Sequence, residues 1–221
     1  MCSLLWFSEV KVAVIGDLII DEYITCDTLG MSEEDPTIVV TPVDNRRFVG
    51  GAGIVAAHAS ALGAKSSLYS VTGKDATRDY SISALAEYKV NAHLLLDENR
   101  PTTLKQRFRA QNKTLLRVSH LHQGSIEKKL QDDIEKRISK EVCNLDLLVF
   151  SDFNYGCLPQ PLVEKITALC QANNVIMIAD SQCSSQIGDI SRFRGMHLLT
   201  PTEREVRISL RNQEDGLVVI A

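Results

Sequence analysis

Carboxylate side chains follow several apolar runs of this sequence, where they could accept hydrogen bonds from ligand hydroxyls. Asp17 comes shortly after the β-branched run at residues 10–15, with Asp21 four residues later, and Asp152 and Asp180 follow two further apolar runs. In an open parallel sheet, polar groups just beyond the carboxyl ends of the strands face the ligand-binding side. We therefore predict that Asp17 and Asp21 accept hydrogen bonds from hydroxyls; capping of a turn is the alternative for either residue.

The densest glycine motif is Val-Gly-Gly-Ala-Gly at residues 49–53, followed by an apolar segment that ends at Gly63. Glycines at Gly50 and Gly51 permit a sharp turn and close approach of a ligand to the backbone. The segment is apolar nearly all round, as in a buried helix, so the glycines precede a helix amino terminus whose N–H groups suit polar or anionic ligands. A tight loop that only opens a core helix is an equally good interpretation. The motif lacks the Gly-Lys-Ser/Thr of a phosphate-binding loop and the glycine spacing of a dinucleotide fingerprint.

A row of basic side chains lies on a predicted hairpin formed by residues 104–110 and 115–119. Lys105 shares one strand face with two arginines, by the two-residue period of a strand, and Arg117 lies on the second strand. Such a row could bind a phosphate. A solvated strand face is the alternative.

Strand and helix patterns alternate along the rest of the chain, which predicts an α/β fold with a parallel sheet covered on both faces. We expect strands at 10–15, 66–72, 92–95, 145–150, 175–179 and 196–199, and helices at 54–62, 78–88, 125–142 and 161–172. Residues 23–49 interrupt the pattern with short exposed strands at 37–40 and 46–49, separated by a turn at Pro42 and Asp44-Asn45. We interpret them, with the hairpin, as a small β flap on a single domain.

The composition is that of an ordinary globular protein, with 44% hydrophobic and 24% charged residues among 221. A formal net charge of -4 gives no electrostatic reason to expect nucleic acid or an anionic membrane as a partner. The six cysteines show no metal-binding spacing, and no apolar run approaches the roughly 20 residues that span a bilayer. We expect a cytoplasmic protein with reduced thiols.

The order of these motifs resembles the ribokinase-like (PfkB) carbohydrate kinases and, within them, the heptose-phosphate kinase half of ADP-heptose synthases. The matching stretches are GDLIIDEY at 16–23, MSEEDP at 31–36, VGGA at 49–52, PTTLK at 101–105 with Leu116-Arg117, SDF at 151–153 with Gly156, and TPT at 200–202 with Glu205. The resemblance implies a three-layer αβα fold with a mostly parallel sheet and a β lid made by segments near 23–49 and 101–120.

The resemblance also implies transfer of the γ-phosphoryl group of ATP, with Mg²⁺, to a hydroxyl of a phosphorylated sugar, heptose 7-phosphate in the heptose branch. It assigns two groups of residues to the substrate: Asp17, Asp21, Gly50, Gly51 and Asp152 to the sugar, and Lys105 and Arg117 to its phosphate. On the nucleotide side it places Asp180, Thr202 and Glu205, with Glu205 organising Mg²⁺ through water.

Three departures from the family pattern affect this interpretation. Ile54 stands where the heptose kinases have a sugar-binding Asn, and Thr202 stands where the family has Asn in Thr-Pro-Asn-x-x-Glu. The Gly-Ala-Gly-Asp signature, which supplies the oxyanion-hole amides and the catalytic base, does not occur near the end of the sequence. We therefore assign no catalytic residue within this sequence, and expect a fold that is incomplete at its carboxyl end and inactive alone.

Two alternatives to a kinase are a non-catalytic sugar-phosphate-binding or regulatory protein of the same fold and a nucleotide-sugar-binding Rossmann protein. The second is weaker because the required glycine spacing is missing. Exposed flap strands can pair with those of another molecule, so we predict a homodimer through the flap. The resemblance to ADP-heptose synthases adds a possible fused nucleotidyltransferase domain.

Overall fold

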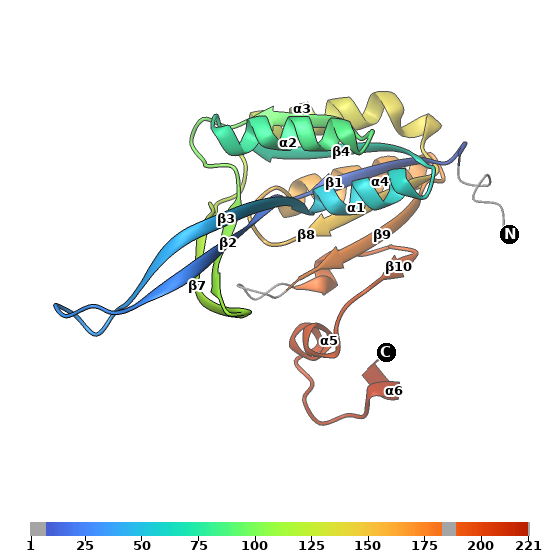
Figure 1. The fold of residues 1–221 in the computed structure, drawn as a ribbon. Coiled ribbons are helices and arrows are strands. Elements are labelled where there is room, and N and C mark those ends of the chain that lie inside the picture. Colours follow the sequence, from blue (N-terminus) through green and yellow to red (C-terminus); the bar gives the residue numbers. More distant parts are fainter. Residues whose placement is uncertain (1–7, 183–188, 221) are drawn as a thin grey trace, which may run out of the picture.

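The computed structural model describes residues 8–182 and 189–220, which form a main sheet between helices and a smaller sheet that projects from it (Figure 1). The main sheet is parallel throughout, with the strand order β10-β9-β8-β1-β4-β5. Its strands are β1 (Lys11–Gly16), β4 (Lys65–Thr72), β5 (Asn91–Leu96), β8 (Leu147–Asp152), β9 (Ile176–Ser181) and β10 (Leu198–Leu199).

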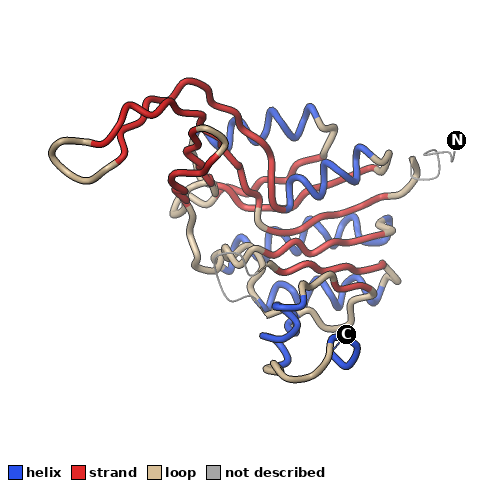
Figure 2. Tube along the Cα trace, turned by 60° about the horizontal axis from the view of Figure 1, so that its bottom comes forward, coloured by secondary structure: helices blue, strands red, loops and turns tan. Residues whose placement is uncertain are grey.

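Helices cover both faces of the main sheet, which makes the three layers predicted from the sequence (Figure 2). On one side lie α1 (Ala52–Ala61) and α2 (Ala76–Glu87), and on the other α3 (Lys128–Glu141) and α4 (Gln160–Ala172). The remaining helical segments are η2 (Val142–Asn144), η3 (Ile190–Arg192), α5 (Glu203–Leu210) and α6 (Leu217–Ile220). None of the helices in the described part of the chain has the length and apolar character of a bilayer-spanning segment.

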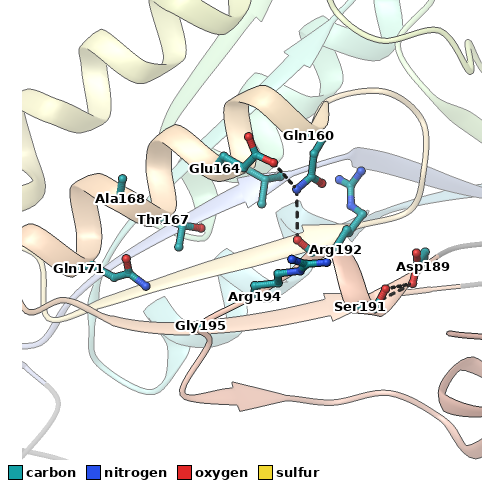
Figure 3. Close-up of a pocket in the computed structure, with 11 residues that line it drawn as sticks. Gln160, Glu164, Thr167, Ala168, Gln171, Asp189, Ser191, Arg192, Arg194 and Gly195 are labelled. Carbon is teal, nitrogen blue, oxygen red and sulfur yellow. Dashed lines mark hydrogen bonds between the residues drawn. The ribbon is translucent and has the colours of Figure 1, made fainter. Parts of the chain in front are cut away.

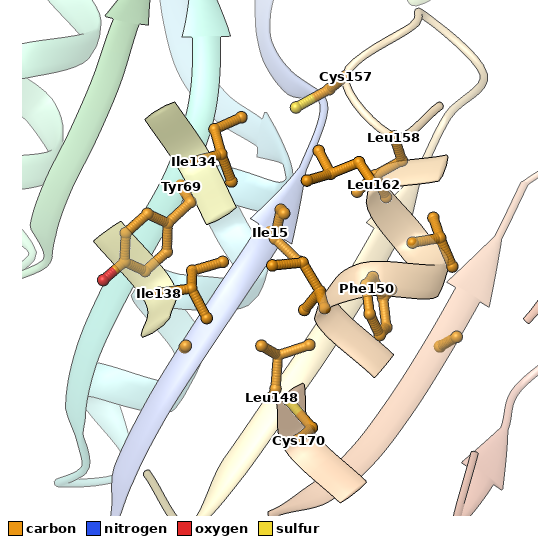
Figure 4. Packing of buried hydrophobic residues seen from close by; sticks show 14 of the residues in the cluster. Ile15, Tyr69, Ile134, Ile138, Leu148, Phe150, Cys157, Leu158, Leu162 and Cys170 are labelled. Carbon is orange, nitrogen blue, oxygen red and sulfur yellow. The ribbon is translucent and has the colours of Figure 1, made fainter. Parts of the chain in front are cut away.

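The larger of two apolar clusters fills the space between the main sheet and the helices α3 and α4 (Figure 4). Ile15 of β1 and Phe150 of β8 are fully buried there against side chains of both helices, including Ile138 and Leu162. Because helices cover both faces, the central strands are continuous apolar runs rather than alternating ones. This packing holds the strand ends in place, where the polar residues of the predicted site begin.

The smaller sheet, which we call the lid, has the strand order β3-β2-β6-β7. Its strands are β2 (Leu18–Met31), β3 (Ile38–Gly51), β6 (Leu104–Ala110) and β7 (Lys113–His120). β6 and β7 form the predicted hairpin. The chain passes from β1 into β2 through Asp17 alone, so the lid is continuous with the main sheet at this point.

The predicted turn at Pro42 and Asp44-Asn45 is wrong. Residues 38–51 form one strand, in which Asp44 pairs with Thr25 and Asn45 pairs with Ile24. The register shifts between Thr25 and Cys26 as a bulge forms, and Pro42 pairs with Cys26. β3 lies at the edge of the lid, where the missing N–H of a proline is tolerated, so the proline and the bulge bend the strand without ending it.

Candidate functional site

Three of the predicted carboxylates meet at the carboxyl ends of neighbouring parallel strands, and we call this the strand-end site. Asp17 follows β1, Asp152 ends β8, and Asp180 is the next-to-last residue of β9, paired with Ser151. Burial raises the pKa of both Asp17 and Asp180, and the charge of Asp152 raises both further, so the three carboxylates lie close enough to interact. The parallel register brings together residues that are far apart in sequence.

Asp17 is buried, with 4% of its surface exposed, and Asp152 is buried to a similar extent at 2%. Its Oδ2 accepts hydrogen bonds from the backbone N–H groups of Phe153 (2.9 Å) and Tyr155 (3.2 Å), and its Oδ1 accepts one from Cys157 (3.1 Å). Burial and then the charge of Asp152 raise the pKa of Asp17 to about 6, against the opposing effect of these three hydrogen bonds. The carboxylate is directed into the segment after β8, and its predicted role as a direct acceptor for sugar hydroxyls stays a prediction.

Gly50 and Gly51 end β3 immediately before α1, as the glycine motif predicts. Gly51 has a φ of 56°, and a Cβ there would lie 2.3 Å from the backbone oxygen of Asp17. A Cβ on Gly50 would lie 2.5 Å from Oδ2 of Asp21. Gly51 therefore requires glycine, because its φ is positive and the backbone passes directly against Asp17, whereas a side chain at Gly50 would displace the carboxylate of Asp21.

Asp21 and Lys105 lie on the same face of the lid, since they are paired in register between β2 and β6. The carboxylate of Asp21 forms an ion pair with Arg107 of β6. Although burial acts to lower it, the hydrogen bond and charge of Asp21 raise the pKa of Arg107. Asp21 therefore belongs to the lid, and its partner is Arg107, one of the two arginines that share the strand face of Lys105 and were not predicted as site residues.

The ammonium group of Lys105 lies over two aromatic rings that follow β8. Its Nζ is 5.6 Å from the ring centroid of Phe153 and 5.1 Å from that of Tyr155. Among the residues that the structure describes, no carboxylate pairs with Lys105. This face of the lid is therefore turned toward the strand-end site. The aromatic pair was not predicted, because nothing in the local sequence distinguishes Phe153 and Tyr155 from core residues.

Arg117 is exposed and lies directly opposite Arg107 on the neighbouring strand β7. The described residues provide no ion pair or hydrogen bond to its side chain. Like charges at directly opposed positions repel each other, and Asp21 offsets only the charge of Arg107. Among the described residues, Lys105 and Arg117 are thus two of the lid cations that form no ion pair, and Arg109 and Lys113 are two others.

On the nucleotide side predicted by the resemblance, Asp180 accepts a hydrogen bond from the hydroxyl of Thr200 at 3.0 Å. Burial and then the charges of Glu205 and Asp152 raise the pKa of Asp180. Glu205 lies in the first turn of α5, where its carboxylate accepts the backbone N–H of Thr202 at 2.7 Å. The hydroxyl of Thr202 accepts the N–H of Glu205 in return, so these two residues form a capping box.

An open groove on the outer side of α4 lies apart from these residues (Figure 3). It runs between α4 and the segment around η3, and Thr167 and Arg194 are among its lining residues. None of the site residues predicted from the sequence lines it. Arg192 connects the two regions, because it lines the groove while its Nη2 lies 3.6 Å from the carboxylate of Asp152.

Comparison with known protein families shows to which family this chain belongs. A model described as "pfkB family carbohydrate kinase" matches residues 10–219. The chain belongs to this family. The resemblance inferred from its motifs is thereby confirmed, and the matched region includes the lid and the strand-end site.

Curated relatives and solved structures agree with the pfkB assignment. The chain is 31% identical over 200 residues to "Bifunctional protein HldE" of Desulfatibacillum aliphaticivorans, covering 90% of this chain and 40% of the relative. It is 31% identical over 211 residues to the protein of the same name from Helicobacter pylori strain 26695, covering 93% and 44%. The chain therefore spans less than half the length of these relatives.

Two solved structures show that this pfkB chain has the ribokinase-like fold. Phosphofructokinase-2 from Escherichia coli, solved with substrates and products, aligns with a TM-score of 0.71 at 15% identity, over 94% of this chain and 65% of that one. Arabidopsis thaliana ribokinase with ribose and ATP aligns with a TM-score of 0.67 at 16% identity, over 96% and 66%.

Proposed function

We propose that this chain binds the acceptor sugar in an ATP-dependent kinase whose substrate is a sugar phosphate, D-glycero-D-manno-heptose 7-phosphate. The observation that carries the proposal is the face of the lid over the strand-end site, where Lys105 and Arg117 lie beside the Asp21–Arg107 pair and have no anionic partner among the described residues. A phosphate group would pair with both free cations and offset the repulsion between Arg107 and Arg117.

The acceptor sugar would lie between the lid and the strand-end site. Asp21, which is only partly buried, would accept hydrogen bonds from sugar hydroxyls while Arg107 holds its orientation, and Asp152 would be a further acceptor. Gly50 and Gly51 would let the sugar approach the backbone at the start of α1. The lid would exclude water, which competes with the sugar hydroxyl as the acceptor of a phosphoryl group.

ATP would supply the transferred phosphoryl group, with Mg²⁺ neutralising charge near its phosphates. The residues present fit this arrangement in one respect: burial and then the negative charges of Glu205 and Asp152 raise the pKa of Asp180, and a cation nearby would offset those charges. Glu205 would act through water, since its own carboxylate oxygen accepts the N–H of Thr202 in the capping box. The described residues include no group of three or more potential ligands already gathered for a metal.

The experiment that tests the kinase is an ATP-consumption assay on the protein purified from its native host, with a panel of sugars and sugar phosphates. We expect turnover with heptose 7-phosphate, little with the unphosphorylated heptose, and loss of turnover in Asp21→Asn. Turnover with none of the panel would reject the kinase.

A non-catalytic sugar-phosphate-binding protein is the second candidate. It is favoured by Ile54, which packs against the apolar cluster under α1 instead of offering an amide, and by Thr202, whose hydroxyl is used in the cap of α5. Binding of heptose 7-phosphate in calorimetry without any ATP consumption would support this candidate over the kinase.

We also propose that the lid mediates a homodimer. The far end of the lid carries apolar side chains that are each more than half exposed: Leu29, Met31, Ile38 and Val43. The strands β3 and β7 form the two edges of the lid. Light scattering should give a dimer for the native chain and a monomer for Leu29→Glu/Met31→Glu. Leu62→Glu, at an exposed leucine outside the lid, is the control and should remain dimeric; a monomeric native chain would refute the proposal.

A fused nucleotidyltransferase domain stays a prediction. The intact mass of the protein from its native host, compared with 24.5 kDa for these 221 residues, tests it directly. An equal mass would contradict the prediction.

A further inference from the structure

The segment that follows β8, residues 153–157, forms the boundary between the main sheet and the lid. Its backbone is held almost entirely from the side of the main sheet. Three of its N–H groups donate hydrogen bonds to Asp17. In addition, the carbonyl of Tyr155 accepts a hydrogen bond from Nη1 of Arg100 at 3.1 Å, and the carbonyl of Gly156 accepts one from the N–H of Ile126 at 3.0 Å.

Asp17 contributes the largest share of these contacts from a single side chain. It is buried, it bonds alternate N–H groups at residues 153, 155 and 157, and no other side chain in the described part of the chain bonds those three. Alternate N–H groups converge on one carboxylate only if the segment keeps a defined curvature, so Asp17 determines the shape of the segment.

The two aromatic rings on this segment are the ones that contact Lys105. Phe153 and Tyr155 are two of the three residues whose N–H groups Asp17 accepts, and their rings lie within 5.6 Å of the Lys105 ammonium. A cation over ring faces is attracted by the ring quadrupole, and the lysine keeps its charge and its remaining hydrogen-bonding capacity for another partner. The rings therefore orient a cation that no carboxylate in the described part of the chain neutralises.

We propose that Asp17 is a positioning residue: its buried carboxylate fixes residues 153–157 and, through the rings of Phe153 and Tyr155, sets the position of the Lys105 ammonium for the substrate phosphate. The role of Lys105 toward the substrate phosphate rests on the proposed function, whereas the coupling from Asp17 to Lys105 does not. The proposal differs from direct hydrogen bonding of Asp17 to sugar hydroxyls, because it predicts that Asp17 affects the phosphate of the ligand more than its sugar.

The first test needs no ligand. In NMR spectra, the ε-methylene protons of Lys105 should be shifted upfield by the two rings, and Asp17→Asn should move them toward the position of an exposed lysine. Asn keeps the volume of Asp but offers one acceptor oxygen where three N–H groups need acceptors. Glu141→Gln is the matched control, since Glu141 at the end of α3 accepts a hydrogen bond from the hydroxyl of Tyr69 on β4 and bonds no residue of this segment. An unshifted Lys105 in the native chain, or an unchanged shift in Asp17→Asn, would overturn the proposal.

The second test is a double-mutant cycle with heptose 7-phosphate and the same heptose without phosphate, measured by calorimetry. Asp17→Asn should weaken binding of the phosphorylated sugar about tenfold, as expected for a misplaced charge-assisted contact, with a much smaller effect on the plain heptose. In the Lys105→Met background the substitution should have little further effect, because the two residues act as a unit. Equal weakening for both sugars would indicate direct contact of Asp17 with the sugar and would refute the positioning role.

The outcomes separate this inference from the proposed function. A native chain that shows the Lys105 shift and its loss in Asp17→Asn, but binds neither sugar, would contradict the proposed function and leave the coupling established. If Asp17→Asn does not fold, the native chain is titrated instead: the amide signals of residues 153, 155 and 157 and the Lys105 methylene signal should shift together as the Asp17 carboxyl is protonated. The ionisable groups around that carboxyl are Asp152 and Cys157, with Arg100 beyond the thiol. Independent midpoints for the amides and the lysine would refute the coupling.

Discussion

The buried carboxylate of Asp17 should make the protein less stable as the pH rises from acid to neutral. Its pKa lies at about 6 in the folded chain, against a usual value of 3.8, because burial and Asp152 disfavour the charged form. Between these two values the folded chain keeps a proton that the unfolded chain has released, so the free energy of unfolding falls with rising pH. At about 1.4 kcal/mol for each pH unit, the full effect is about 3 kcal/mol, and it is complete above the folded-state pKa.

Urea unfolding of the native chain and Asp17→Asn at a series of pH values measures this effect. The difference in the free energy of unfolding, native minus variant, should fall by about 2 kcal/mol between about pH 4.5 and 7.5, which is the part of the linkage inside that window. Groups that do not interact with Asp17 titrate alike in both proteins and cancel in the difference. A difference that is constant, or that grows with pH, would refute the assignment of the raised pKa to Asp17.

Three further substitutions test the geometry of the site. Gly51→Ala should lower the free energy of unfolding in urea by roughly 2 kcal/mol or more, because it combines a positive φ with contact against the Asp17 carbonyl. Gly30→Ala is the control, since Gly30 also has a positive φ but no neighbouring atom within 4 Å, and it should destabilise the chain less. Equal destabilisation by the two substitutions would contradict the contact at Gly51. Glu22→Gln should lower the free energy of unfolding by about 1–3 kcal/mol, since the buried Glu22 carboxylate accepts hydrogen bonds from Asn45, Arg47 and Gln106. A decrease no larger than that caused by Glu33→Gln, at an exposed glutamate, would show that these hydrogen bonds contribute little to stability. Asp21→Asn should weaken the affinity for the unphosphorylated heptose, measured by calorimetry, because it removes a charged acceptor and leaves Arg107 unpaired. An unchanged affinity would exclude Asp21 as a sugar ligand.

The elements that depend on local patterns were predictable. The buried runs of β1 and β8, the all-apolar helix α1 and the hairpin of β6 and β7 each carry their signal within a short window, because burial on both faces and turn formation restrict residue types locally. The extended course of β3 was not predictable for the same reason: Pro42 and Asp44-Asn45 favour a turn locally, and only pairing with β2 across the lid keeps them in one strand.

The sequence by itself determined which side chains are available for binding: carboxylates after the strands, glycines before α1 and a row of cations on the hairpin. Only the tertiary structure decided how these side chains are used. Arg107 pairs with Asp21 because β2 and β6 lie side by side in a particular register, while Lys105 meets Phe153 and Tyr155 because the lid faces the end of β8. Asp17 is buried and its pKa raised for the same reason: its environment is built from residues more than a hundred positions away. Residue type is a property of the sequence, whereas burial, charge pairing and protonation depend on neighbours that only the fold supplies.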